Sequence, residues 1–402
     1  MGKRAIHRSD SFTIKETMIG DHQVYLTASV TGKDADPHQI CQQIYRQILQ
    51  ILARDKMEIV HERLFGSVAM QADILAIRNK ILSRDHREQE LPVTYIQGQP
   101  HWGLGFAGVQ LRAVNPVKNG DNAWTIYDGE VPRGRGWRRN GTTYIMLQNI
   151  HGVTAADIGR KDYRDQARLM FEKANTLLVN QGASYLNVVR TWIYLKDILQ
   201  WYPDFNQVRN EMYQQFKLIP ANGGQRLPES IYLPASTGIM GTNTLDAASV
   251  MDVLAIIPGS TNNIIIKHEA GVRQKSPYRY GSAFSRAVRI TEQDITHVML
   301  SGTAAIDETG RSLFPGDARS QIQKTLEVIG KLVEKEGASL KDICEATVFL
   351  KRPEDIDEYY RVMADWNLID LPSVVVIADI CRAELLFELD AVVALSNTNL
   401  KQ

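Results

Sequence analysis

Hydrophobic positions repeat along the chain in the same order three times. Each copy opens with an apolar run of strand length, at residues 24–29, 144–149 and 297–302. A segment with apolar residues three or four positions apart follows at 37–54, 163–180 and 318–336, and this spacing predicts an amphipathic helix in each copy. Gly182 and Gly337 follow the second and third of these segments, where a glycine commonly ends a helix.

A second strand and a second helix complete each copy. The strands are predicted at 59–65, 188–195 and 343–350, and the second helix is clearest at 202–216 and 356–366. Each copy closes with Leu-Pro and two strands, over 91–114, 233–257 and 371–395. The order β-α-β-α-β-β predicts an α+β unit in which helices cover a sheet. Three such units can cover one another's apolar sheet faces, so we expect a ring of related units, a pseudo-trimer.

These repeats divide the chain into a first unit at 1–114, a connection at 115–142, a second unit at 143–258 and a third unit at 265–402. The connection is rich in Gly and Arg, and it is locally basic at 132–139. One interpretation is a solvated hairpin tip, since loops lie on the surface. The other is a flap that carries arginines to an acidic ligand.

The closing hairpin of the third unit holds the residues of greatest chemical interest. Cys381 lies in its connection, and Glu388 follows seven residues later in an apolar strand. Alternation places Glu388 and Asp390 on the same face of that strand. A lone acid in such a run is costly unless it is paired or protonated, which makes Glu388 a candidate for chemistry. The alternatives are an edge-strand acid that faces water, or a structural acid paired with Arg382.

Composition narrows the class of protein. The chain has 402 residues and a formal net charge of zero, with 46 basic and 46 acidic side chains, so no nucleic-acid or membrane partner is expected. Its three cysteines, an odd number and far apart, favour a reducing compartment, and we expect a cytoplasmic protein without a signal peptide. The histidines show no metal-ligand spacing with the cysteines, and no glycine-rich phosphate loop follows a strand, so neither metal nor cofactor is predicted.

The repeated pattern resembles the YjgF/Rid family. The elements that carry the resemblance are strand, helix, Gly-Ala-Ser, Val-Val-x-Thr-x-Ile-Tyr-Leu, second helix and Leu-Pro hairpin. The resemblance implies sheet and helix layers like those of chorismate mutase, and clefts between units, because that family is trimeric with clefts between subunits. Its imine-hydrolysing members carry an arginine two residues after the Pro of the closing hairpin. That position is Thr94, Ser236 and Val374 here, which speaks against 2-iminoacid hydrolysis.

A narrower resemblance, over about residues 91–395, is to the chorismatases. These are Rid-like enzymes that remove pyruvate from chorismate to make dihydroxycyclohexadienoate or hydroxybenzoate. The matching segments are 190–198, 201–209, 233–239, 280–287, 301–304 and 381–388. The resemblance implies that Glu388 is the general acid. It also implies that Cys381 marks the hydroxybenzoate-forming branch, 3-hydroxybenzoate being favoured, as a nucleophile or by steering an intermediate; the alternative is that Cys381 is a small buried hydrophobe.

Chorismate is a dicarboxylate with an enol ether, so its site needs cations, a proton donor and apolar walls. We assign carboxylate binding to Arg190, Arg209 and Arg286, although a surface arginine is the alternative for Arg209. The other substrate-binding candidates carry a hydroxyl or a guanidinium: Tyr194, Tyr202, Tyr280, Ser236, Thr303 and Arg382. For the tyrosines the alternative is core packing.

The expected protein is therefore a cofactor-free enzyme with a small carboxylate substrate, built as a monomeric pseudo-trimer or a higher homo-oligomer of pseudo-trimers. The rival within enzymes is a Rid-type imine or enamine deaminase. The rival outside enzymes is a non-catalytic protein that binds a small carboxylate in a cleft between units.

Overall fold

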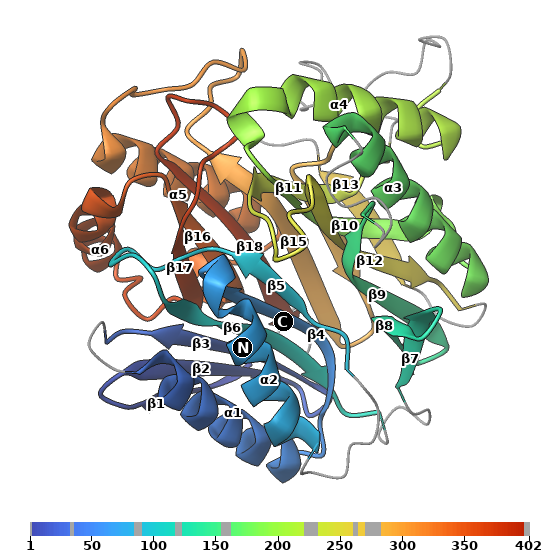
Figure 1. Cartoon of the computed structure of the whole chain (residues 1–402), viewed down its shortest axis with the longest axis horizontal. Helices are drawn as coiled ribbons and strands as arrows, with labels where there is room; N and C mark the ends of the chain where they lie inside the picture. The colour runs from blue at the N-terminus through green and yellow to red at the C-terminus, as the bar shows by residue number, and fades with distance from the viewer. Residues whose placement is uncertain are drawn as a thin grey trace.

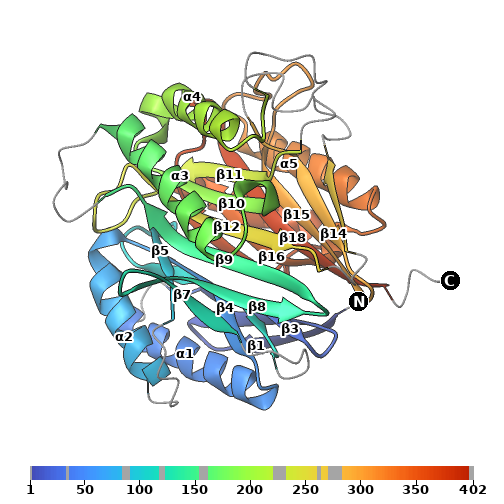
Figure 2. The same cartoon turned by 90° about the vertical axis from the view of Figure 1, so that its right-hand side faces the viewer.

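The computed structural model of the chain describes residues 2–32, 36–83, 91–116, 123–153, 162–220, 232–259, 264–269 and 283–397. Three sheets meet in the middle of the molecule, and the helices lie outside them in pairs (Figure 1). Figure 2 shows one such pair, α3 and α4, lying over the second sheet. Among the described residues, no helix combines the length and the apolar character that crossing a membrane requires.

The three units have the same elements in the same order. The first contains β1 (Lys3–Arg8), β2 (Phe12–Ile19), β3 (Gln23–Val30), α1 (Pro37–Arg54), β4 (Glu58–Gly66), α2 (Gln71–Ser83), β5 (Thr94–Gln97) and β6 (Phe106–Val114). The second contains β7 (Trp124–Asp128), β8 (Val131–Arg139), β9 (Thr142–His151), α3 (Tyr163–Asn180), β10 (Val188–Leu195), α4 (Ile198–Gln215), β11 (Ala235–Met240) and β12 (Ser249–Ile257). The third contains β13 (Ile265–Glu269), β14 (Ala287–Thr291), β15 (Ile295–Ala304), α5 (Ala318–Glu334), β16 (Ile343–Leu350), α6 (Ile356–Asp365), β17 (Ser373–Ile377) and β18 (Phe387–Ser396).

Sheet topology confirms that one unit is written three times. The strand orders are β1-β2-β3-β6-β4-β5, β7-β8-β9-β12-β10-β11 and β13-β14-β15-β18-β16-β17. In each sheet the last pair is parallel, because a helix crosses over between its two strands. The helices begin and end where local chemistry predicts. Asp36, Asp162 and Asp317 accept a backbone N–H at the start of α1, α3 and α5. Gly182 and Gly337 take the left-handed conformation after α3 and α5, with φ of 76° and 75°.

The structure corrects the predicted unit in one respect. Each sheet begins with two further antiparallel strands, so that residues expected in the connection 115–142 form β7 and β8 of the second sheet. The glycines of β8 interrupt the apolar alternation from which a strand is predicted. The packing of the sheet nevertheless requires glycine at position 136, because a Cβ there would lie 2.2 Å from the Trp124 ring. The flap interpretation is wrong for two of the arginines, because Arg135 binds Glu58 at 2.9 Å and Arg139 binds Glu292 at 2.6 Å.

The hydrophobic core has four parts. Each unit buries apolar side chains between its sheet and its own helices, and a fourth cluster lies where the three sheets face one another. That central cluster includes Phe65, Trp192 and Phe349, one from each unit. The predicted mutual covering of sheet faces is therefore confirmed.

Buried polar contacts cross the central core and join each pair of units. Arg63 of the first unit binds Glu345 of the third at 2.7 Å, and His61 of the first lies 3.0 Å from Asp252 of the second. The second and third units are joined by Nη2 of Arg190, which lies 3.1 Å from Oδ2 of Asp390. Charged groups this deeply buried are tolerated only when they are paired, so these contacts fix how the sheets face one another.

We predict that Asp390→Asn destabilises the protein by about 3–5 kcal/mol, because it leaves a buried guanidinium without its counter-charge. Asp365→Asn is the control, since it removes an acid that binds Arg319 on the surface, where an ion pair is worth about 0–1 kcal/mol. Thermal unfolding of the two variants and the wild type measures the difference. Equal melting temperatures for the two variants would contradict the structural importance of the buried pair.

Candidate active site

A cavity lies between the second and third units and is lined by residues from both. The second unit supplies side chains from α4 and β11, and the third supplies side chains from β15, β18 and the segments before β14 and β18. The lining residues are Tyr202, Arg209, Ser236, Gly238, Phe284, Arg286, Gly302, Ala304, Ile306, Cys381, Arg382 and Glu388. Its volume is about 50 Å³, so a ring-sized ligand requires the lining side chains to move.

Glu388 is the acid of this cavity. It is the second residue of β18, where it pairs with Ala304 of β15 and Phe349 of β16, and it is 4% exposed. The neighbouring strand makes room for it: a Cβ on Gly302 would lie 2.0 Å from Oε1 of Glu388. Glycine is therefore required at position 302 for the acid to lie where it does.

Two carboxylates on one face of β18 have different surroundings. Asp390 accepts hydrogen bonds from Arg190, from Oγ1 of Thr237 at 2.7 Å and from the backbone N–H of Thr347 at 3.3 Å. The pKa of Glu388 is raised to about 8, first by burial and then by the charge of Asp390, while Arg286 and Arg190 oppose the change. A carboxyl with such a pKa is mostly protonated at neutral pH, which is the state that a general acid needs.

Two arginines from different units meet at an aromatic ring of the cavity. The guanidinium of Arg209, on α4, lies 5.7 Å from the centre of the Phe284 ring, and that of Arg286 lies 5.6 Å from the same centre. Both are almost fully buried, at 1% and 2% exposure. Asn206 accepts a hydrogen bond of 2.6 Å from Nη2 of Arg209. A pair of guanidiniums beside an acid is suited to an anionic substrate.

The thiol and the other polar groups of the lining are held by the protein. Burial raises the pKa of the Cys381 thiol to about 12, with Glu388 adding to the effect, so Cys381 is a neutral thiol near pH 7. Arg382 donates to the carbonyl of Gly310 at 2.6 Å, and not to Glu388 as the structural alternative for that acid required. Ser236 accepts a hydrogen bond of 2.9 Å from Oγ1 of Thr191.

Seven of the predicted site residues thus line one cavity: Glu388, Cys381, Arg209, Arg286, Tyr202, Ser236 and Arg382. Tyr280 lies outside the described residues. Three others are corrected, since Arg190, Tyr194 and Thr303 are buried away from the lining. Tyr194 contacts Nη1 of Arg63 at 3.3 Å, and Thr303 donates to the carbonyl of Ser301 at 2.9 Å.

Arg190 was expected to hold the substrate, but its guanidinium is used inside the protein. It is fully buried, lies 4.6 Å from the Trp192 ring, and donates to Oγ1 of Thr237 at 2.6 Å as well as to Asp390. The reason is that its side chain faces the central core, where Asp390 of the next unit meets it. The pKa of Arg190 is lowered to about 10, mainly by burial and in spite of the charge of Asp390, so the guanidinium is charged at neutral pH.

Sequence reasoning gave no role to several residues that shape the site. Asp390 does not line the cavity, but its charge raises the pKa of Glu388. The further lining residues are Phe284, Gly238, Gly302, Ala304 and Ile306. The available signals were the spacing of Asp390 from Glu388 on one strand face and the glycine between Ser301 and Thr303, where β15 shifts its register against β18. Neither signal identifies the residues of the second unit that lie next to Asp390 and Gly302.

The acid occurs in one unit alone among three equivalent positions. The first residue of β6, β12 and β18 pairs with the last residue of β4, β10 and β16 respectively. In β6 a register shift inserts one extra residue, Ala107, after this pair. The last residue but one of β4, β10 and β16 pairs with Gly108, Val250 and Glu388 respectively, so these three residues are equivalent. Among the described residues, the carboxylic acid at this position therefore belongs to β18 of the third unit alone. Within the described ranges, no three His, Cys, Asp or Glu side chains gather as a metal site.

We predict a specific pH dependence of stability from Glu388. The folded-state pKa of about 8 lies above the ordinary value of 4.5, so between these values the folded protein holds a proton that the unfolded chain releases. The contribution of Glu388 to stability therefore falls as the pH rises from about 5 to about 8, and is constant above that window. The melting temperature of the wild type should fall relative to that of Glu388→Gln across the window. The exposed Glu384→Gln serves as the control. A difference between wild type and Glu388→Gln that does not change with pH would contradict the raised pKa.

Comparisons with known proteins agree with this architecture. A family model described as Endoribonuclease L-PSP matches residues 149–223 and 277–395. A chorismatase of Streptomyces rapamycinicus is 26% identical over 322 residues, which is 73% of this chain and 90% of that protein. A 3-hydroxybenzoate synthase of Streptomyces hygroscopicus is 25% identical over 314 residues, 72% of this chain and 86% of that protein.

A solved chorismatase structure has the same fold. It superposes with a TM-score of 0.54 at 18% identity, covering 83% of this chain and 92% of the solved one. The repeated units, the strand order and these relatives together confirm the resemblance drawn from the sequence. The chain is thus similar to chorismatases and, over two segments, to the family that the Endoribonuclease L-PSP model describes.

Proposed function

We propose that this protein is a chorismatase-type enzyme that converts chorismate and releases pyruvate. The observation that carries the proposal is a buried carboxylic acid, Glu388, whose pKa of about 8 keeps it protonated in a cavity that two arginines also line. The names of the relatives, chorismatase and 3-hydroxybenzoate synthase, support this choice of substrate. Chorismate carries two carboxylates and an enol ether, so it needs both the cations and the acid.

In the proposed reaction Glu388 donates its proton to the methylene carbon of the enolpyruvyl group. The electron pair of the carbon–carbon double bond takes the proton, which leaves an oxocarbenium ion at the ether carbon. Addition of water to that carbon and collapse of the adduct release pyruvate and dihydroxycyclohexadienoate. On the route to a hydroxybenzoate the ring also loses one water, so pyruvate and hydroxybenzoate together contain the atoms of chorismate.

Substrate binding would strengthen Glu388 in its role. The positive charge of Arg286 acts to lower the pKa of Glu388. A substrate carboxylate bound to Arg286 and Arg209 offsets that positive charge and adds a negative one, so the acid keeps its proton until the reaction uses it. Burial strengthens these interactions, because fewer water molecules screen them.

We propose that Cys381 directs the ring towards 3-hydroxybenzoate. It lines the same cavity as Glu388 and is a neutral thiol, so it acts through its shape and polarisability and not as a free thiolate. A 2-iminoacid deaminase is less compatible with the site, because Ser236 stands in this cavity where an arginine would hold the substrate carboxylate.

The test is incubation of the pure protein with chorismate, with pyruvate measured by a coupled lactate dehydrogenase assay. We expect pyruvate release by the wild type and a loss of about a hundredfold or more in Glu388→Gln, since general acid catalysis contributes about 10²–10⁴-fold. Glu384→Gln, on the exposed turn before β18, is the matched control and should keep its rate. Full pyruvate production by Glu388→Gln would show that another group is the acid. Unchanged chorismate together with stabilisation by benzoate would favour a binding protein.

The product is tested separately with Cys381→Ala. We expect this variant to release pyruvate at a rate within a few-fold of the wild type, while the ring product changes from 3-hydroxybenzoate towards the diene-diol. Chromatography of the products with authentic standards measures the ratio. The same product ratio in wild type and variant would contradict the steering role.

A further inference from the structure

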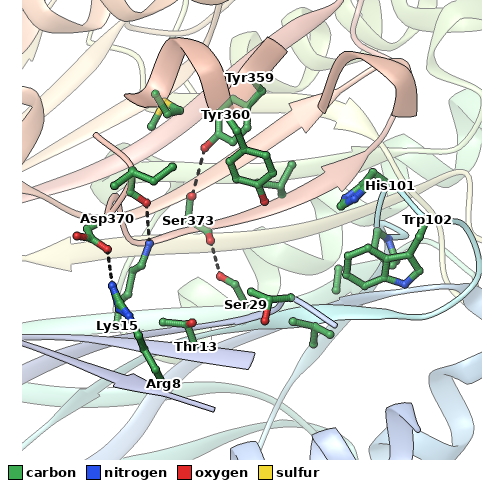
Figure 3. A pocket seen from close by; sticks show the side chains of 17 residues that line it. Arg8, Thr13, Lys15, Ser29, His101, Trp102, Tyr359, Tyr360, Asp370 and Ser373 are labelled. Carbon is green, nitrogen blue, oxygen red and sulfur yellow. Dashed lines mark hydrogen bonds and ion pairs between the residues drawn. The ribbon is translucent and has the colours of Figure 1, made fainter. Parts of the chain in front are cut away.

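A second and larger cavity lies between the first and third units, with a volume of about 450 Å³ (Figure 3). It shares no lining residue with the cavity of Glu388. The first unit contributes β1 to β3 and the loop before β6, and the third contributes α6, β17 and the turn between them. The lining residues include Arg8, Thr13, Lys15, Ser29, His101, Trp102, Tyr359, Tyr360, Asp370 and Ser373.

This cavity occupies the equivalent cleft of a different pair of units. Helix α6 and strand β17 stand here where α4 and β11 stand in the cavity of Glu388, and β3 and β6 replace β15 and β18. The position equivalent to Glu388 is Gly108, and its neighbour Ala107 lines the cavity. This cleft therefore has no carboxylic acid at the position of Glu388, and its volume is larger than that of the Glu388 cavity.

One end of the cavity is cationic. Nζ of Lys15 donates to the carbonyls of Leu371 at 2.8 Å and Ile369 at 3.3 Å, so one N–H of its ammonium remains for a ligand. Arg8 lies beside it and binds Asp370 at 3.0 Å, with both partners more than half exposed. Two cations and one acid therefore leave a positive balance at this end.

The cationic end of the cavity keeps its net positive charge at neutral pH. Burial lowers the pKa of Lys15 to about 8, with Asp370 opposing the change and Arg8 adding to it, so most of the ammonium is charged. Burial also lowers the pKa of His101, which is therefore neutral and adds no charge at the other end.

The opposite end is aromatic. Figure 3 shows His101 and Trp102 across the cavity from Arg8 and Lys15, with Tyr359 and Tyr360 on the wall between. The rings of His101 and Trp102 pack edge to face at 4.7 Å. The loop that carries them is held on the third unit, because the backbone N–H of Ile377 donates to the carbonyl of Gln99 at 2.9 Å. This contact ties the loop of the first unit to β17 of the third.

We propose that this cavity is a second, non-catalytic binding site for a small aromatic carboxylate. The carboxylate would bind Lys15 and Arg8, and the ring would lie against Trp102 and the tyrosines. A ring face on aromatic side chains and a carboxylate on an ammonium together match the two ends of the cavity. The proposal does not depend on the activity of the Glu388 cavity.

The test is binding of 3-fluorobenzoate, followed by ¹⁹F NMR, to the full chain without chorismate. We expect Lys15→Met and Trp102→Leu each to weaken binding by about tenfold, the first through the loss of a charge-assisted hydrogen bond and the second through the loss of an aromatic contact. Leu104→Ala is the control, because Leu104 belongs to the same loop but is 80% exposed and does not line the cavity. Arg286→Met, which alters the other cavity, should keep this binding.

Two variants are used because the binding of 3-fluorobenzoate to Trp102→Leu can be measured even where Lys15→Met fails to fold. Binding that both variants leave unchanged, or binding that Arg286→Met abolishes, would overturn the proposal. No binding at millimolar 3-fluorobenzoate would overturn it too. Equal binding of 3-fluorobenzyl alcohol, which has the ring without the charge, would overturn the assignment of a carboxylate.

Discussion

The ion pair between Arg190 and Asp390 is the interaction on which both the fold and the site depend. It joins the second unit to the third across the central core, at 3.1 Å and with both side chains almost fully buried. It also places a paired carboxylate two residues from Glu388, on the same strand face. Since the negative charge of Asp390 is held there by a guanidinium and two neutral donors, the neighbouring carboxyl is the one that keeps its proton. A contact that holds units together thereby also sets the chemistry of the cavity.

The pseudo-trimer explains how the described part of one chain forms the cavity of Glu388 and a larger cavity between other units. Three units of the same topology produce equivalent clefts, and the residue at one position of the closing strand decides what each can do. Glu388 is the proposed proton donor, whereas Gly108 has no side chain and Val250 is part of the buried core. In a trimer of identical chains these positions could not differ, so joining the units in one chain is what allows the clefts to acquire separate roles.

Periodicity in the sequence was enough to predict most of the repeated unit. Helices α1 and α3 and strands β10 and β16 begin and end at the predicted residues, because their apolar positions recur at the spacing of a helix or a strand. The leading strands of each sheet were missed. β8 shows why: Gly134 and Gly136 and its arginines break the apolar alternation, although the strand is needed where Trp124 packs against Gly136.

The residues that line the cavity were predicted better than the contacts across units that hold them in position. Glu388 and Cys381 stand out on one hairpin, and the resemblance brought in Arg209 and Arg286 from other elements. The prediction that Arg190 binds substrate was wrong for a physical reason. A buried arginine on a strand needs a partner, but the sequence does not show that this partner is Asp390 of another unit. Contacts across units, including the space that Gly302 leaves for Glu388, follow from the packing of three sheets and not from local pattern.

The most direct test of the central claim is the protonation state of Glu388 itself. Infrared difference spectroscopy of the wild type against Glu388→Gln across a pH series isolates the carboxyl stretch of this one side chain. A protonated carboxyl band that persists through neutral pH and disappears around a pKa of about 8 is the expected result. A carboxyl that has already ionised near its ordinary pKa of 4.5 would contradict the claim that Asp390 and burial keep Glu388 protonated.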